Sequence, residues 1–452
     1  MRLALVITIC LITQVASGQD FTPEQTKEDL QFLVRSLEAY NPALYEYNPS
    51  FKDNVAKVTQ EITNNVDKFG YFQLVSRVAA LSNEGHIGVG NWEDTFHNGF
   101  LNNTYKYLPL AVSVVDGRVY AWADLTVEEA IQKGDEILSI NGRPTDELVA
   151  DMMTYLSTDG HIKSSAYYKL TAGFNWMYYL YIEQPEKFEL SYKIRETGTI
   201  AEITMPAITR QQMVDNLKDK NTTKKAPMAP SGAEEVYEFE IEDGVGFLTL
   251  KSFNRQLIER HKIKAKKLYK EVFEKLNESN VENLVIDLRN NNGGRYEFGF
   301  EILPFIMKEE RSGWFKTSIS WEGKVKEYKL PRQDKANFMG DIWVLVNGGT
   351  FSTSSSLARY LKEYAGATIV GEEGAGRYEG FVAGSQQYVH LPNSKLRVAI
   401  PRYHNKFPES SVQKTTNRGV LPDQEVVYTV NDLIEERDMA MEKVRKLIAE
   451  SN

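Results

Sequence analysis

The strongest constraint on the fold is an alternation of apolar, strand-like segments with helical segments in the second half of the chain. The predicted strands are 245–250, 284–288, 342–346 and 367–370, and the predicted helices are 258–276, 297–307 and 354–364. Strands joined by helices of this length make right-handed crossovers, so the pattern predicts a mainly parallel sheet covered by helices. Ligands of such α/β sheets bind at the carboxyl ends of strands. The loops that follow Leu288 and Val346 are therefore the first candidates for a site.

The first 18 residues have the pattern of an export signal. Arg2 precedes an apolar run over 3–15, and the small residues Ala16-Ser17-Gly18 follow it. This run is shorter than the roughly 20 residues that a transmembrane helix needs. Cys10 is the only cysteine, so a chain that has lost the signal has no disulfide, cysteine nucleophile or thiolate metal ligand. The sequence predicts an exported protein, secreted or periplasmic, with no stable membrane span after signal cleavage.

The rest of the chain divides into predicted parts with different patterns. Residues 19–100 have helical periodicity and end in a glycine-rich loop around His86. The segment GDEILSINGRPT resembles part of the PDZ fold and predicts a PDZ-like β module. The predicted parts are the signal 1–18, the N-terminal helical domain 19–100, the PDZ-like module 105–165, a connecting β region 166–217, a linker 218–235 and an α/β domain 236–452 with a C-terminal helix.

Charge and residue spacing exclude several classes of partner. The formal net charge is −9, which provides no general field for phosphate backbones, so nucleic acid is not an expected partner. No pair of histidines has the helical spacing of metal ligands, and no cysteine remains after the signal. The sequence therefore predicts neither a metal nor a cofactor.

The loop after Val346 carries a serine cluster at the start of a predicted helix, at 352, 354, 355 and 356. A hydroxyl at a helix N-terminus lies beside unpaired backbone N–H groups, which can stabilise a developing oxyanion. Serine is also a preferred N-cap residue, so plain capping is the alternative interpretation. The residues alone favour capping.

Two further loops could complete such a site. Gly293-Gly294 follows a predicted buried strand, and glycine allows close backbone approach and N–H donation; a simple turn is the alternative, and phosphate binding is a weaker one. A nucleophilic serine needs a base. Among six histidines, His86 stands out because glycines flank it, although an exposed loop histidine would have the same pattern.

The order of the motifs adds a resemblance to these interpretations. The segments GHIGVG, LVIDLRNNNGG, VLVNGGTFSTSSSLA, ATIVGEEGAG and NRGVLPD resemble the carboxyl-terminal processing (tail-specific) serine protease family, in its branch with the tricorn core and retinoid-binding relatives. The resemblance implies an α/β fold with a crotonase/ClpP-like catalytic domain, a PDZ-like module and a small N-terminal helical domain.

The resemblance also implies roles for individual residues. Ser352 matches the nucleophile, and Thr353 with Gly293 or Gly294 matches the oxyanion hole. One branch of the family uses a lysine as base, but the matching residue is Arg377, which stays protonated. The other branch uses a histidine, which matches His86, while Glu372 is a candidate for the orienting acid.

The resemblance therefore predicts a secreted serine endopeptidase of the tail-specific type. It would cleave peptide or protein substrates through a Ser352–His86 dyad or triad and an acyl-enzyme, without a cofactor. The alternatives are a weakly active or inactive binder of apolar ligands or peptides on the same fold, and an esterase that uses the same serine. An unperturbed histidine base predicts activity that rises with pH near about 6.5.

Overall fold

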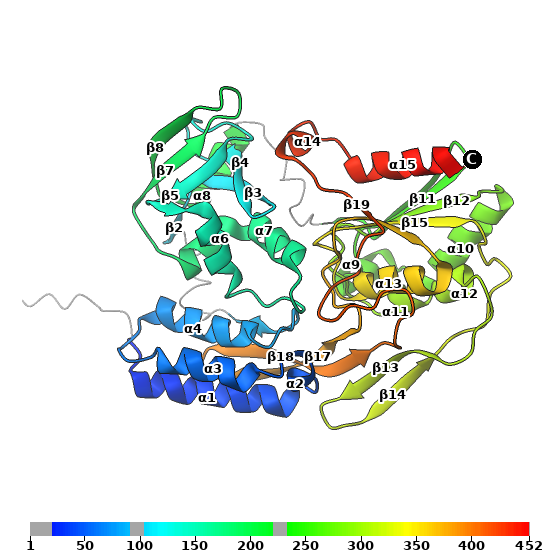
Figure 1. The fold of residues 1–452 in the computed structure, drawn as a ribbon, viewed down its shortest axis with the longest axis horizontal. Helices are drawn as coiled ribbons and strands as arrows, with labels where there is room; N and C mark the ends of the chain where they lie inside the picture. Colours follow the sequence, from blue (N-terminus) through cyan, green and yellow to red (C-terminus); the bar gives the residue numbers. More distant parts are fainter. Residues whose placement is uncertain (1–19, 91–103, 220–232, 452) are drawn as a thin grey trace, which may run out of the picture.

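A central, mainly parallel sheet forms the core of the second half of the chain (Figure 1). The computed structural model describes residues 20–90, 104–219 and 233–451, so the predicted export signal lies outside the described residues. In the described part, the strand order is β10 (Tyr237–Glu242), β11 (Val245–Leu250), β12 (Asn283–Asp287), β15 (Asp341–Val346), β16 (Thr368–Gly371) and β19 (Gln424–Glu425). Only the β10–β11 pairing in this sheet is antiparallel. The predicted parallel α/β sheet is confirmed.

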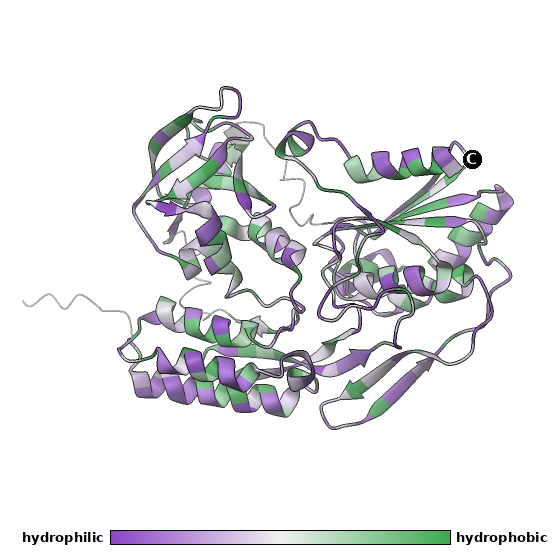
Figure 2. Cartoon of the chain, in the orientation of Figure 1, coloured by the Kyte–Doolittle hydropathy of each residue, from purple (hydrophilic) through white to green (hydrophobic). Residues whose placement is uncertain are grey.

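Helices cover both faces of this sheet, as the alternation of its apolar side chains requires. Leu284 and Ile286 of β12 pack into one core cluster with helical residues such as Leu361, whereas Val285 packs on the other face with Val444. Figure 2 shows the resulting hydrophobic strands between amphipathic helices. The helices of this region are α9 (Arg255–His261), α10 (Ala265–Glu278), α11 (Glu297–Phe300), α12 (Leu303–Ile306), α13 (Thr353–Ala365), α14 (Val430–Ile434) and α15 (Met439–Ser451).

Two of the predicted helices are each divided into two. The predicted helix 258–276 breaks where Lys262 adopts a left-handed backbone with φ 54° and ends α9. The predicted helix 297–307 breaks before α12, because Pro304 has no N–H to continue the hydrogen bonding. Neither break moves the loops that follow β12 and β15.

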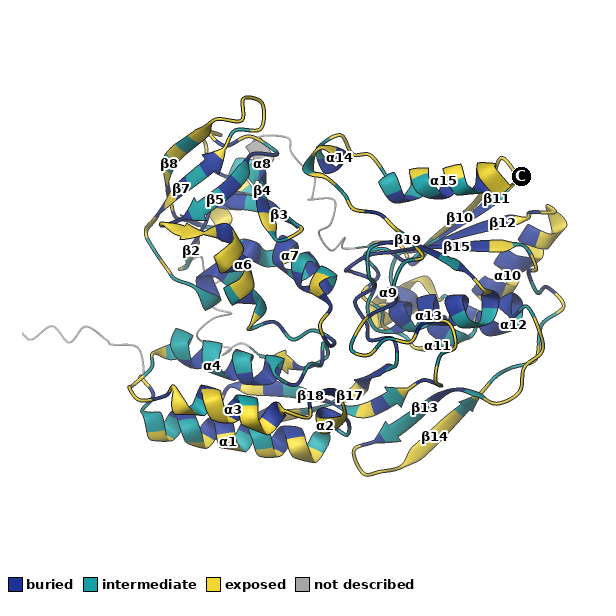
Figure 3. Ribbon diagram, in the orientation of Figure 1, coloured by how far each residue is buried: buried dark blue, intermediate teal, exposed yellow. Residues whose placement is uncertain are grey.

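The predicted N-terminal helices exist, but they share their core with distant strands. Their bounds are α1 (Pro23–Tyr40), α2 (Leu44–Tyr47), α3 (Phe51–Gln60) and α4 (Lys68–Ala80). Leu30, Leu33 and Val75 pack with Val398 and Ile400 in one cluster. The second sheet has the order β1 (Gly88–Val89), β18 (Arg397–Lys406), β13 (Trp314–Ser320) and β14 (Val325–Lys329), with β17 (Gly380–His390) on β18. In Figure 3 the helices bury the side that faces β17 and β18 and expose the other.

The β module in the first half is larger than the sequence predicts. Strand β5 pairs with β7 at Ile137↔Tyr192, which joins the predicted module 105–165 to the predicted region 166–217. The predicted boundary also falls inside α7, whose residues Leu170 and Phe174 pack against this sheet. The linker predicted at 218–235 lies mostly outside the described residues.

The elements of this module are β3 (Leu110–Val115), β4 (Arg118–Asp124), β5 (Glu136–Ile140), β6 (Arg143–Pro144), β7 (Lys187–Lys193), β8 (Ile200–Pro206), α6 (Thr145–Met153) and α7 (Lys163–Tyr181). A small ribbon of β2 (Lys106–Tyr107) and β9 (Ile208–Thr209) leads into α8 (Arg210–Asp219). Among the described helices, none combines the length and the apolar character that a bilayer crossing requires.

Candidate active site

Ser352 lies in a tight turn between β15 and α13. Its backbone has φ 59° and ψ −119°, a conformation that costs a residue with a side chain on the order of 1–3 kcal/mol. Although Ser352 occupies the N-cap position of α13, its hydroxyl makes no capping hydrogen bond. The hydroxyls of Ser354, Ser355 and Ser356 each donate to a backbone carbonyl. Capping therefore does not account for Ser352, whose strained turn aims its hydroxyl elsewhere.

His86 meets Ser352 from the other end of the chain. Its Nε2 lies 2.9 Å from the Ser352 Oγ. The imidazole is held between Phe351, at a ring-centre distance of 4.4 Å, and Phe381, at 5.4 Å. Pairing of Gly88 with Ala399 fixes the loop on β18. His86 is therefore packed in place, unlike an exposed loop histidine.

The other imidazole nitrogen of His86 lacks a partner. Its Nδ1 is buried and makes no hydrogen bond to the described residues. Carboxylate oxygens of Glu84 and Asp159 and a ring nitrogen of His86 lie within 4.8 Å of one another. Asp159 is fully buried, and its two oxygens accept from the N–H of Gly85 at 2.7 Å and of Arg377 at 3.1 Å. Two acids are thus close enough to orient the histidine.

Glu372, the acid named from the sequence, lies elsewhere. It lines a separate cavity with Arg289 and Tyr428, and the described residues show no contact between Glu372 and His86. Asp159 could not be found from a motif, because it lies in the connection between α6 and α7. Only the packing of that connection against the His86 loop brings it to the site.

Arg377 holds the acid cluster together. Its Nη1 lies 2.6 Å from the Glu84 Oε1, and both side chains are fully buried. Its guanidinium also lies 3.6 Å from the ring centre of Tyr47 and donates to the Asn83 carbonyl. Among the described residues, only Glu84, His86 and Asp159 form a group of three or more potential metal ligands. The Arg377 guanidinium pairs with Glu84, one member of this group. Arg377 thus places a fixed positive charge beside the histidine.

Burial dominates the protonation of the site. It lowers the pKa of His86 to about 4; the carboxylate of Asp159 opposes this shift, and the charges of Lys169 and Arg377 add to it. The expectation of a pKa near 6.5 is therefore wrong, because the imidazole is packed between aromatic rings. Burial also lowers the pKa of Lys169 to about 8, against the effect of Asp159. At neutral pH the imidazole is uncharged and can accept a proton.

The predicted oxyanion loop lies against Ser352. A Cβ on Gly293 would lie 2.8 Å from both the Ser352 Cβ and the Thr353 nitrogen, so no larger residue fits without movement. The Gly293 N–H donates to the Asn291 side chain at 2.9 Å. The Thr353 N–H is at the start of α13, and the Gly294 N–H has no acceptor among the described residues. Thr353 and Gly294 are therefore the better placed donors for an oxyanion.

Ser352 and Thr353 open onto a cleft of about 760 Å³. The β13–β14 hairpin and strands β17 and β18 contribute to its walls, and many of its side chains are aromatic. The aromatic lining is Tyr296, Phe300, Trp321, Tyr328, Tyr360, Phe381 and Tyr403. The cleft is large enough to accept a segment of polypeptide.

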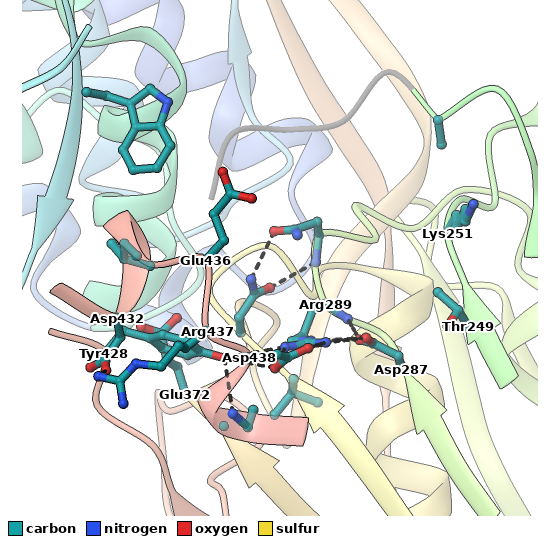
Figure 4. Close-up of a pocket in the computed structure, with 18 of the residues that line it drawn as sticks. Thr249, Lys251, Asp287, Arg289, Glu372, Tyr428, Asp432, Glu436, Arg437 and Asp438 are labelled. Carbon is teal, nitrogen blue, oxygen red and sulfur yellow. Dashed lines mark hydrogen bonds and ion pairs between the residues drawn. The ribbon is translucent and has the colours of Figure 1, made fainter. Parts of the chain in front are cut away.

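A larger cavity of about 900 Å³ lies at the carboxyl ends of β12 and β15, and Ser352 is not among its lining residues. In Figure 4 Arg289 lies between Asp287 and Asp438, with ion-pair distances of 2.6 Å to each. Asn290 and Asn347 hydrogen-bond to each other on this wall, at 2.9 Å in both directions, and so join the loops that carry Gly293 and Ser352. The hydrogen bonds between Asn290 and Asn347 thus hold the two loops together at the wall of this cavity.

Part of the chain matches a known protein family. Residues 244–426 match the family model for peptidase family S41. This segment is similar to an S41 peptidase domain. Ser352, Thr353 and the Gly293-Gly294 pair lie inside the S41 segment, whereas His86 and Asp159 lie before it. The resemblance to tail-specific proteases is confirmed, and the matched segment is similar to peptidases of this kind.

Two curated relatives are similar to part of the chain. A chloroplastic carboxyl-terminal-processing peptidase 2 of Arabidopsis thaliana is 29% identical over 180 residues, which are 40% of this chain and 31% of the relative. A carboxyl-terminal-processing protease of Picosynechococcus sp. is 25% identical over 241 residues, which are 52% of this chain and 48% of the relative. The matches thus span about a third to a half of the relatives' length.

Solved structures match most of this chain in fold. The crystal structure of mature CPAF has a TM-score of 0.65 at 17% identity, over 94% of this chain and 97% of that chain. Mature CPAF complexed with lactacystin has a TM-score of 0.66 at 17% identity, over 94% and 98% of the two chains. At this identity the likeness establishes the overall fold, including the elements that precede the S41 segment.

Proposed function

We propose that the protein is an exported serine endopeptidase in which Ser352 is the nucleophile and His86 the general base. The observation that carries the proposal is the 2.9 Å contact between the His86 Nε2 and the Ser352 Oγ. The strained turn at Ser352 and the uncharged imidazole support it, because the hydroxyl is exposed to a base that can accept its proton.

The reaction follows from these positions. The His86 Nε2 takes the Ser352 proton while Oγ adds to the scissile carbonyl carbon, and the N–H groups of Thr353 and Gly294 stabilise the oxyanion. The imidazolium then gives its proton to the leaving amine as the C–N bond breaks. Water, deprotonated by His86, hydrolyses the acyl-enzyme and restores the Ser352 hydroxyl. No step needs a cofactor.

Asp159 is the residue that we assign to positioning His86. An imidazolium has a second N–H at Nδ1, which needs an acceptor in a buried site. Glu84 is already paired with Arg377 and accepts from the Val382 N–H. Within the described part of the chain, Asp159 accepts only from neutral backbone N–H groups. Its negative charge favours the protonated imidazole that forms during the reaction.

The substrate that we propose is an extended peptide segment of a protein. The aromatic cleft beside Ser352 and the relatives' names, which describe carboxyl-terminal processing, support this class. The PDZ-like module would help to hold such a segment by strand addition. The predicted export signal supports action in a secreted or periplasmic setting.

A fluorophosphonate probe tests the nucleophile directly. Wild-type protein should be labelled and should cleave an unfolded protein substrate, whereas Ser352→Ala should do neither. Ser320→Ala is the matched control, because Ser320 lines the same cleft but lies on β13 and not on the Ser352 turn. Labelling of Ser352→Ala, or none of wild type, would contradict the proposal, and the second result would favour a non-catalytic binder. Hydrolysis of esters but not peptides would indicate an esterase.

A further inference from the structure

Lys316 is a buried cation in the active-site cleft. It lies on β13 with a relative exposure of 9% and lines the cleft together with Ser352. Lys316, Ser318 and Ser320 alternate along the strand and all face the cleft. The Lys316 ammonium lies 4.2 Å from the ring centre of Tyr328 and 5.5 Å from that of Tyr296. Among the described residues, no carboxylate is within ion-pair distance of Lys316.

The charges around Lys316 are also positive. Lys326 on β14 and Arg402 on β18 line the same cleft, and neither makes an ion pair with the described residues. The Arg402 Nε is buried without a hydrogen-bond partner, although its Nη2 donates to Ser385. Glu322 is the only acidic side chain among the described residues that line the cleft, and it is paired with Lys324 at 2.8 Å. A protein of net charge −9 therefore has an electropositive wall where its substrate would bind.

An unpaired buried charge is unfavourable, so its presence needs an explanation. Contact with the Tyr328 ring compensates part of the free energy that the Lys316 ammonium loses when it is removed from water. A ring face stabilises the charge less than a carboxylate would. Burial lowers the pKa of Lys316 to about 8, and the charge of Lys326 acts in the same direction. The ammonium is still mostly protonated at neutral pH. An anionic group that enters the cleft would supply the missing partner.

We propose that Lys316 receives a carboxylate of the substrate, and that the peptidase selects segments that carry an acidic group into this cleft. This inference rests on the proposed function. The carboxylate could belong to an aspartate or glutamate side chain or to a free carboxyl terminus, because both present the same two oxygens. Lys326 and Arg402 add long-range attraction for such segments.

Internally quenched peptides of ten residues would test the preference. At each position in turn they carry glutamate or glutamine, and each is made with a free or an amidated carboxyl terminus. Wild type should cleave the best glutamate peptide, or the free-terminus form, with a kcat/KM about 10- to 100-fold above its neutral partner, as expected for a hydrogen bond between charged groups. A preference for glutamate over glutamine would identify a side-chain carboxylate. A preference for the free over the amidated form would identify the carboxyl terminus.

Variants assign the preference to Lys316. Lys316→Met should abolish it, so that the acidic and neutral members of each pair are cleaved with equal kcat/KM. Its melting temperature should not fall, because a buried unpaired charge is removed. Lys329→Met is the control, since Lys329 is exposed on the same hairpin outside the cleft, and it should keep the preference. Equal cleavage of acidic and neutral peptides by wild type, or an unchanged preference in Lys316→Met, would overturn the inference while the proposed function stands.

A binding measurement tests the carboxylate site without requiring turnover. Fluorescence anisotropy of the same peptides, labelled with a dye, on Ser352→Ala should show tighter binding of the acidic member of each pair, and Lys316→Met in that background should lose the difference. If wild type cleaved nothing but this difference were found, the proposed function would fail and the carboxylate site would stand. Equal binding of both members would contradict the site.

Discussion

The Nε2 of His86 lies 2.9 Å from the Oγ of Ser352, although 266 positions separate the two residues. The S41 segment contains Ser352 and the backbone N–H groups beside it, while His86 comes from the loop after α4. That loop is held by the β1–β18 pairing and by a core shared between the N-terminal helices and β18. The candidate site therefore exists only when the first and last parts of the chain are packed together.

The pH dependence of turnover should reflect the buried state of His86. The base must be neutral, and its pKa is lowered to about 4, so kcat/KM should be full at neutral pH and should fall only as the pH drops toward about 4. Initial rates between pH 3.5 and 8 on a quenched peptide measure this limb. His404 has a pKa lowered to about 4 by burial as well, so His404→Gln is the control and should retain the limb. A midpoint near 6.5 would show that His86 is exposed in solution.

Replacement of Asp159 should lower kcat by more than any accompanying loss of stability would explain. Asp159→Asn keeps the shape but removes the charge that favours the imidazolium, so kcat should fall about 100- to 10,000-fold with little change in KM. Asp135→Asn is the matched control, because Asp135 is equally buried and accepts two backbone N–H groups at 2.9 Å, far from the serine. Melting curves should shift similarly for both. Equal kcat in the two variants would remove Asp159 from the mechanism.

Local patterns were sufficient to predict the parts of the site that lie on single loops. The strand, tight turn and helix around Ser352 and the glycine pair after β12 follow from periodicity and residue type, and the structure brings them together. The two helices that were predicted too long break at Lys262 and near Pro304. Local sequence rules explain these breaks only once their positions are known. The roles of these residues in catalysis stay predictions.

Tertiary packing determined what the sequence could not reveal. Asp159 has no motif and reaches His86 only through the connection before α7. Lys316 lies in an alternating strand pattern that does not tell which face is buried or what lacks a partner there. The low pKa of His86 depends on Phe351 and Phe381, which come from two other segments.

The buried Arg377–Glu84 pair should be important for stability. Both side chains are fully buried at an Nη1–Oε1 distance of 2.6 Å, so Arg377→Met should leave Glu84 uncompensated and lower the free energy of unfolding by about 3–5 kcal/mol. Urea denaturation followed by tryptophan fluorescence measures the loss. Replacement of the exposed Lys187 by Met breaks its 3.4 Å pair with Glu189 and should change stability by less than about 1 kcal/mol. Similar losses in both variants would show that the Arg377 pair is solvated.

The final prediction concerns Gly293, whose backbone touches the nucleophile turn. In Gly293→Ala the new methyl group would lie 2.6 Å from the Phe351 carbonyl oxygen and 2.8 Å from the Thr353 nitrogen, so the loop must move away from the oxyanion donors. Loss of one such donor typically lowers kcat about 100- to 1,000-fold. Gly366→Ala separates backbone strain from this contact, because Gly366 also has a positive φ, of 63°, but has open space around its Cβ position. It should lose about 1 kcal/mol of stability and keep full activity. Normal turnover in Gly293→Ala, measured on the same quenched peptide, would mean that this loop does not take part in stabilising the transition state.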